Sequence, residues 1–261
     1  MFPNKKNLLA LAIAGTTVAS VNAEEATIDP SDVTNVYTQA AVMVGGNSDI
    51  KPVAMISGGY DNGHTFAFLG EATFGKDDKS DNADNQFGFK FKDARAQYFH
   101  VLNTGNTYLP KAGFSLDGIT QTSSSMDTDL LAVGTLAAIN PKYTPGFMMF
   151  PQVAYVNGEM DFKALDYKES VDGFSTALIM TRTLGDSGAF MLFYPEYQNL
   201  SGDNIDIEGY KLQLNINAPM TENRRWWLNT RFDYSQQTID AGMLSVKTEE
   251  SQAYLGVRYF F

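Results

Sequence analysis

Residues 252–261 of the chain read QAYLGVRYFF. Apolar side chains occupy every second position of this stretch, from Ala253 to Phe261, and polar residues such as Gln252 and Arg258 stand between them. A period of two indicates a β-strand whose two faces meet different surroundings. The apolar face of such a strand packs against a second sheet in a soluble protein, or faces lipid in a membrane barrel.

The same alternation recurs upstream, in segments separated by clusters of Gly, Asn, Asp and Pro. In the clearest case, Tyr210, Leu212 and Leu214 share one face while Lys211 and Gln213 share the other. An even number of strands is typical of single-chain bacterial barrels, and the alternation predicts twelve. The expected strands are 37–44, 50–60, 64–75, 87–102, 108–120, 128–139, 147–157, 172–184, 189–199, 205–218, 225–237 and 246–261. An extra hairpin at 160–171 would raise the number to fourteen.

Three features favour lipid over a soluble sandwich. Charged residues such as Arg231, Asp233 and Arg258 lie on the polar faces in greater number than a half-buried sheet needs. Aromatic residues at the expected strand ends fit two interfacial girdles; they are Tyr60, Phe74, Tyr108, Trp226, Trp227 and Tyr259. Short and long connections also alternate, as periplasmic turns and extracellular loops do. The short ones are 61–63, 103–107, 140–146, 185–188 and 219–224, and the long ones include 76–86, 158–171 and 238–245. The sequence therefore predicts an all-β, antiparallel up-and-down transmembrane β-barrel.

The beginning of the chain predicts a signal peptide. Lys5 and Lys6 precede an apolar stretch, and small residues at Val21 and Ala23 fit the cleavage pattern of a signal peptidase. We expect residues 1–23 to be removed on export, 24–36 to form a periplasmic tail and 37–261 to form the barrel. The chain has no cysteine, so disulfides contribute nothing to its stability.

The formal net charge of -11 disfavours nucleic-acid binding, because phosphate contacts need a basic face. Acidic residues gather in the expected outer loops, and 76–86 alone contains Asp77, Asp78, Asp81 and Asp84. We interpret this run as a solvated face that keeps the loops apart. A loose calcium site, or contact with a partner, is the alternative.

The alternation that ends at Phe261 resembles the C-terminal signal of Gram-negative outer-membrane β-barrel proteins, in which a final aromatic residue follows apolar residues at every second position. The matching residues are Ala253, Leu255, Val257, Tyr259 and Phe261. The resemblance implies recognition by the barrel-assembly machinery and insertion into the outer membrane, where the barrel meets lipid and lipopolysaccharide. The architecture is porin-like, with no subfamily indicated. We expect a monomer without a cofactor.

The sequence offers little for catalysis, and we expect no enzyme. Its only histidines are His64 and His100. An outer-membrane lipase or deacylase needs a serine–histidine pair that a third group orients. The alternation places His100 outward near the periplasmic interface and His64 beside a periplasmic turn, away from the outer leaflet. Metal binding through histidine or cysteine is disfavoured for the same lack of ligands.

The polar faces predict what lines the barrel interior. Five basic and three acidic residues are expected there, together with neutral amides; the set is Glu71, Arg95, Gln97, Lys111, Asp117, Gln152, Lys211, Gln213, Asn215, Asn229, Arg231, Asp233 and Arg258. These charges either pair across a plugged lumen or line a narrow pore that orients small polar solutes. Eight strands give a filled interior and sixteen an open channel. We favour a passive channel for small hydrophilic solutes. The alternative is a non-conducting surface barrel whose acidic loops bind lipopolysaccharide, another cell or a phage.

Overall fold

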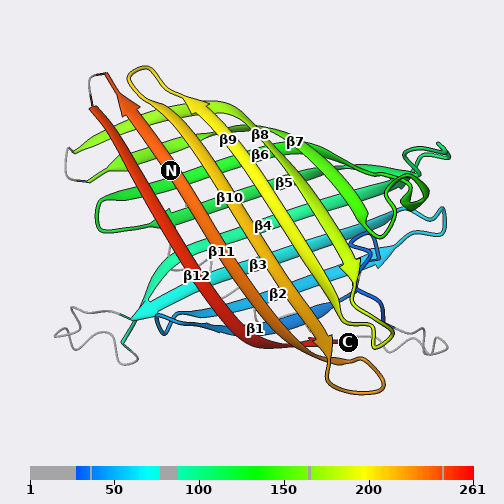
Figure 1. Ribbon diagram of the computed structural model, residues 1–261. Helices are drawn as coiled ribbons and strands as arrows, with labels where there is room; N and C mark the ends of the chain where they lie inside the picture. The colour runs from blue at the N-terminus through cyan, green and yellow to red at the C-terminus, as the bar shows by residue number, and fades with distance from the viewer. Residues whose placement is uncertain (1–27, 36, 77–87, 164–165, 243) are drawn as a thin grey trace.

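The computed structural model describes residues 28–35, 37–76, 88–163, 166–242 and 244–261. Within these ranges, twelve strands follow one another in chain order around a closed antiparallel barrel (Figure 1). They are β1 (Gln39–Gly45), β2 (Ile50–Gly59), β3 (Thr65–Lys76), β4 (Phe89–Asn103), β5 (Lys111–Thr122), β6 (Met126–Ala138), β7 (Met148–Phe162), β8 (Tyr167–Thr183), β9 (Phe190–Ser201), β10 (Asp206–Pro219), β11 (Trp226–Ala241) and β12 (Leu244–Phe260). One 3-10 turn, η2 (Pro141–Tyr143), lies between β6 and β7. None of the described segments is a helix long and apolar enough to span a membrane.

The prediction of a twelve-stranded barrel is confirmed, and the alternative of fourteen strands is wrong. Residues 158–171 form no separate hairpin, because β7 and β8 continue as one ladder through the pairs Glu159↔Ser170 and Phe162↔Tyr167. The loop expected at 238–245 is likewise strand: β11 and β12 pair as far as Ala241↔Leu244. The expected strand 246–261 already contains most of this extension; the structure adds Leu244 and Ser245, and every residue from Leu244 to Ser251 is exposed.

These extensions also overturn the expected long loops at 158–171 and 238–245, whereas the expected loop 76–86 falls in the long connection between β3 and β4. We call the end of the barrel where Gln39 and Phe260 lie the terminal end, and the opposite end the far end. Connections at the far end, such as 123–125 and 242–243, are as short as those at the terminal end, such as 60–64. The predicted signal peptide (1–23) and the acidic run Asp77, Asp78, Asp81 and Asp84 lie outside the described residues.

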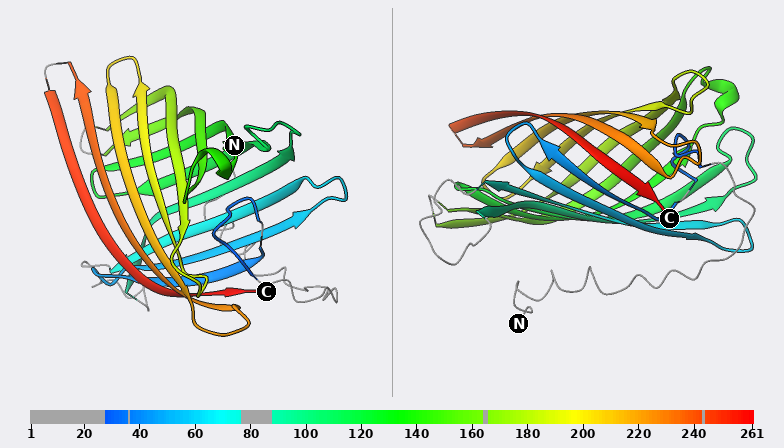
Figure 2. Two further views of the ribbon diagram at one scale, coloured as in Figure 1. Left: turned by 45° about the vertical axis from the view of Figure 1, so that its right-hand side comes forward. Right: turned by 90° about the horizontal axis from the view of Figure 1, so that it is seen from below.

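The barrel closes by pairing β1 with β12, from Gln39↔Phe260 to Gly45↔Tyr254 (Figure 2). One further hydrogen bond extends this seam, because the amide N–H of Phe261 donates to the carbonyl of Thr38 over 3.0 Å. Closure removes the free edges that a sheet otherwise exposes, and every strand then has two partners.

The outer face of the barrel is apolar along its middle. Large exposed hydrophobic side chains point outward from neighbouring strands, among them Val42, Val44, Ile56, Phe68, Leu116, Val133, Val153, Leu212, Leu255 and Val257. Exposed apolar surface this continuous is unfavourable in water and favourable in lipid. At the far end, the hydroxyls of Tyr197 and Tyr210 on β9 and β10 both donate to Glu208, over 3.1 and 2.9 Å. A ring in lipid with its hydroxyl in a polar layer is the arrangement of an interfacial girdle.

The expected girdle is wrong at one position. Trp226 is exposed and its ring lies 4.8 Å from that of Tyr259 on the outside. Trp227 is only 1% exposed and packs inside the barrel against Phe190 and Phe260, with ring centroids 5.8 and 6.0 Å apart. Since successive side chains of a strand point to opposite faces, two adjacent tryptophans cannot both face lipid.

The two faces predicted for residues 252–261 are also the outward and inward faces of this segment in the structure. The outward face of β12 and the residue after it carries the five residues of the expected assembly signal, Ala253, Leu255, Val257, Tyr259 and Phe261. Tyr254 and Phe260, from the alternate positions, are buried inside. The interior also holds an apolar cluster at the far end, in which Val156, Met160 and Leu200 are each 1% exposed.

Candidate functional site: the barrel lumen

Two cavities lie in the barrel interior. The larger cavity, of about 500 Å³, opens toward the far end and is bordered there by residues of the β11–β12 extension such as Glu250. The smaller cavity, of about 270 Å³, lies toward the terminal end beside Phe260. Glu71, Arg95 and Arg231 line both cavities and therefore mark the boundary between them.

Ion pairs hold this boundary together. Arg231 on β11 bridges two carboxylates: its Nη1 lies 3.2 Å from Oε2 of Glu71 on β3, and its Nε lies 2.8 Å from Oδ2 of Asp233. The side chains of Arg231 and Glu71 are only 8% and 11% exposed. A planar guanidinium can donate hydrogen bonds to two carboxylates at once. This suits a position where the guanidinium and its carboxylate partners have little access to water.

A second cluster adjoins the first on β4 and β5. Arg95 forms an ion pair with Asp117, and its Nε donates to both carboxylate oxygens over 3.0 and 2.8 Å. The amide of Gln97 donates to the same carboxylate over 2.9 Å. We refer to Glu71, Arg95, Asp117, Arg231 and Asp233 as the ion-paired layer. The layer consists of two ion-paired groups, one joining β3 to β11 and one joining β4 to β5, and it lies at the boundary between the two cavities.

The larger cavity carries charge of both signs. Lys51 lies 3.9 Å from Asp93 and 5.1 Å from the ring centre of Tyr254. Lys211 and Glu196 stand opposite each other in the β9–β10 register on the same cavity lining. The lining of this half of the lumen carries four basic and six acidic residues.

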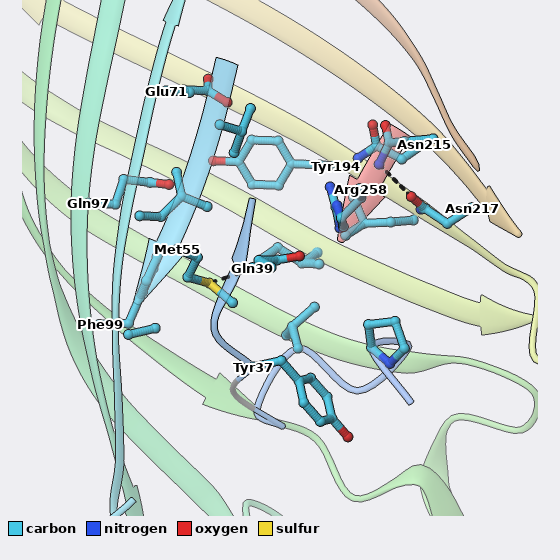
Figure 3. Close-up of a pocket in the computed structure, with 18 of the residues that line it drawn as sticks. Tyr37, Gln39, Met55, Glu71, Gln97, Phe99, Tyr194, Asn215, Asn217 and Arg258 are labelled. Atoms are coloured by element: carbon cyan, nitrogen blue, oxygen red, sulfur yellow. Dashed lines mark hydrogen bonds between the residues drawn. The ribbon is translucent and has the colours of Figure 1, made fainter. Parts of the chain in front are cut away.

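The smaller cavity combines amides with apolar side chains. Asn229 donates to Asn217 over 2.6 Å on neighbouring strands, and both are almost completely buried. Figure 3 shows Arg258 beside Asn215 and Asn217, with Gln97, Phe99 and Met55 on other strands of the lining. The apolar part of the lining includes Met43, Met55, Leu69, Phe99, Ile179, Leu192 and Tyr194.

Residues 28–35, here called the N-terminal segment, border the smaller cavity at the terminal end. Ile28 packs against Phe190, Trp227 and Phe260. The Thr181 hydroxyl donates to the Ser31 carbonyl, and the Lys111 ammonium to the Thr34 hydroxyl, each over 2.5 Å. The described part of the predicted periplasmic tail thus lies against the inner barrel lining and reduces the opening at this end.

The structure places the thirteen predicted interior residues as follows. Those that line a cavity are Glu71, Arg95, Gln97, Gln152, Lys211, Gln213, Asn215, Asn229, Arg231, Asp233 and Arg258. Asp117 lies behind Arg95, and Lys111 contacts the N-terminal segment. Lys51, Asp93 and Glu196 also line the lumen but were missed by sequence reasoning. The alternation in the sequence predicts an inward position for two of them, because Glu196 lies two residues after Tyr194 and Asp93 lies two residues before Arg95.

The histidines lie where the alternation places them, outside the lumen. His100 stacks on Phe114 with ring centroids 5.3 Å apart, and its Nδ1 lies 3.1 Å from the Tyr98 hydroxyl. Nδ1 of His64 lies 3.4 Å from the amide nitrogen of Asn62. These contacts fit an interfacial cluster of rings and include no serine. Across the described ranges, no three side chains of the metal-ligating types lie close enough together to hold an ion.

Solved structures similar to this chain are outer-membrane porins. A NanC porin shares 11% identity, with 85% of this chain and 98% of that chain covered and a TM-score of 0.46. KdgM porin shares 12%, with 87% and 99% covered and a TM-score of 0.41. An anion-selective porin from Comamonas acidovorans shares 11%, with 87% and 97% covered and a TM-score of 0.35. No protein-family model matches the chain, and no curated protein sequence does. Identities and TM-scores this low leave solute and mechanism to be argued from the residues of this chain.

Proposed function

We propose that the protein is an outer-membrane channel through which small hydrophilic solutes diffuse passively. The observation that carries the proposal is the pair of cavities inside the barrel that meet at the charged side chains of Glu71, Arg95 and Arg231. The apolar outer face supports a membrane location, and the resemblance of the stretch ending at Phe261 to the assembly signal supports the outer membrane. A polar interior inside an apolar exterior is the arrangement that channel barrels use.

The ion-paired layer would set what passes. Because Arg231 is bonded to both Glu71 and Asp233, its charge is largely compensated at the boundary between the two cavities. Opposed charges that face one another across a pore orient dipolar solutes and discriminate weakly between ions. The proposal therefore predicts a small conductance, weak ion selectivity and a low size limit.

The deciding experiment is electrical. Mature protein purified in detergent and reconstituted into planar bilayers should give discrete current steps in potassium chloride. Liposome swelling with neutral sugars of increasing size should then show a cut-off. Protein unfolded by boiling before reconstitution is the control, and it should give neither signal.

A second candidate function is a surface barrel that does not conduct. The N-terminal segment favours it, because Ser31 and Thr34 bond to the barrel lining at the terminal end of the lumen. The ion pair between Arg231 and Glu71 would complete the closure. Absence of current steps from correctly folded protein would support this candidate and contradict the channel. Neither candidate requires catalysis, and we propose no enzymatic role.

A further inference from the structure

Arg258 on β12 lines the smaller cavity without a counter-ion. The other two basic residues of this cavity are paired, Arg231 with Glu71 and Asp233, and Arg95 with Asp117. No described residue forms an ion pair with Arg258, and its Nε is buried without a hydrogen-bond partner. A buried guanidinium left in this state is unfavourable, and an anion that reaches it gains charge-assisted hydrogen bonds.

The surroundings of Arg258 supply further hydrogen-bond donors and few competing acids. Among the charged residues that line the smaller cavity, three are basic and one, Glu71, is acidic. Asn215 and Asn217 carry amides on β10 (Figure 3), and Asn229 carries one on the neighbouring strand β11. Because the amide nitrogen of Asn229 already donates to Asn217, the amide nitrogens of Asn215 and Asn217 are the further donors on this part of the lining.

The rest of the lining is suited to an apolar body. Met55, Leu69 and Phe99 come from β2, β3 and β4, while Leu192 and Tyr194 come from β9. Apolar surface does not favour the passage of water or inorganic ions, so its presence beside an unpaired arginine indicates a solute that has an apolar part. The volume of about 270 Å³ is below the roughly 300 Å³ at which sites for drug-sized ligands begin, so the occupant is small.

We infer that the smaller cavity binds a small amphipathic monocarboxylate, with its carboxylate on Arg258 and its apolar body against Met55, Leu69 and Phe99. The carboxylate accepts hydrogen bonds from the guanidinium, and the amides of Asn215 and Asn217 stand beside it. The inference deepens the proposed function, on which it rests for the route by which solute enters, and it names the class of solute that the lumen selects.

The test uses three probes on purified mature protein in detergent. Benzoate has one carboxylate and one ring; benzamide has the same ring and shape without the charge; acetate has the charge without the ring. Saturation-transfer NMR and isothermal titration should show saturable binding of benzoate, with benzamide and acetate weaker by about tenfold or more. Equal binding of benzoate and benzamide to the unmodified protein would overturn the inference without any mutant.

Variants locate the site. Arg258→Gln should weaken benzoate binding about tenfold, whereas Lys168→Gln, at an exposed outer ion pair with Glu159, should leave it unchanged. Met55→Gln on the apolar lining should weaken benzoate and leave acetate as it was. Heat-modifiable migration in gels shows whether each variant has folded. Unaltered benzoate binding in a folded Arg258→Gln barrel would contradict the assignment.

The binding and conduction experiments fail independently. If the protein conducts but binds benzoate no better than benzamide, the channel proposal is supported and the amphipathic site is contradicted. Protein that binds benzoate through Arg258 but gives no current keeps the site and loses the channel.

Discussion

Arg231 on β11 reaches Glu71 on β3 across the barrel interior, with 3.2 Å between Nη1 and Oε2. Three strands, β12, β1 and β2, separate the two residues along the barrel wall. The ion pair therefore spans the lumen instead of following the sheet, and it fixes the width of the lumen at that level. Substitution of Arg231 is therefore expected to change both the conduction that we propose and the stability of the barrel.

Neutralising either partner of this ion pair should shift ion selectivity in opposite directions. Arg231→Gln leaves Glu71 and Asp233 without their cation, so reversal potentials in a salt gradient should move toward cations. Glu71→Gln leaves Arg231 with Asp233 alone, and the shift should be toward anions. Conductance should rise in both variants because the cross-lumen contact is lost. Identical reversal potentials in the two variants would show that the path of the ions avoids this ion pair.

Arg231→Gln should also destabilise the barrel. Two largely buried carboxylates lose their shared partner, which costs roughly 1–3 kcal/mol. The measurement is the urea concentration at which half of the heat-modifiable band is lost. Lys168→Gln, at an exposed ion pair, is the matched control and should stay within about 0.5 kcal/mol of the unmodified protein, since exposed ion pairs contribute little. Equal effects of the two substitutions would argue against a buried cross-lumen bond.

Releasing the N-terminal segment should enlarge the opening at the terminal end. Lys111→Met removes the bond to Thr34, and deletion of residues 29–35 removes the segment from the lumen. Single-channel conductance should increase in the deletion variant and, to a smaller extent, in Lys111→Met. Lys142→Met, at an exposed lysine of η2 at the same end, should conduct as the unmodified protein does. Unchanged conductance in the deletion variant would show that residues 29–35 do not restrict the path.

Deleting Phe261 should reduce assembly in the outer membrane far more than synthesis. The deletion removes the outward ring, which lies 5.1 Å from that of Tyr259, and the bond from the Phe261 amide to Thr38. The ratio of heat-modifiable to total protein in isolated membranes measures the effect. Phe261→Tyr keeps both features and should assemble normally. Normal assembly of the deletion variant would contradict the role implied by the resemblance.

Two glycines on strands that are far apart in the barrel should respond differently to alanine. A Cβ at Gly173 on β8 would lie 2.0 Å from the carbonyl oxygen of Asn199 on β9, whereas one at Gly70 on β3 would meet nothing within 4 Å. Gly173→Ala should therefore destabilise the barrel by roughly 1–3 kcal/mol, and Gly70→Ala should be neutral or slightly stabilising. Urea titration of the folded band separates the two. A neutral Gly173→Ala would mean that β8 and β9 are further apart than described.

The alternation of side chains was enough to predict strand number, closure and the facing of residues such as Arg231 and Glu71, because a period of two leaves each residue only one choice of face. It could not predict that these two residues meet. That contact depends on strand tilt and on the width of the lumen, which no short stretch of sequence encodes.

The misses have physical causes of the same kind. The sequence predicts loops at 158–171 and 238–245, where the structure continues the strands, because Gly158, Asp240 and Gly242 are residue types that are also typical of turns. The sequence predicts a periplasmic tail at 24–36 and does not predict that residues 28–35 contact the barrel lining. Their contacts with Thr181 and Lys111 join segments far apart in the chain, and polar residues near a proline carry no signal for a position inside a barrel.

The pairing of β1 with β12 also determines how exposed the chain is before the barrel has closed. The pairing of Gln39 with Phe260 joins opposite ends of the described chain. The hydrogen bonds between β1 and β12 can therefore form only when these distant segments have been brought together. A chain carrying only β1 to β11 has two unpaired edges, and such edges are templates for aggregation. An open sheet with fewer than the twelve strands leaves the backbone N–H and C=O groups of its two edge strands unpaired. During transit the cell must therefore supply from outside the protection that the finished barrel later provides for itself.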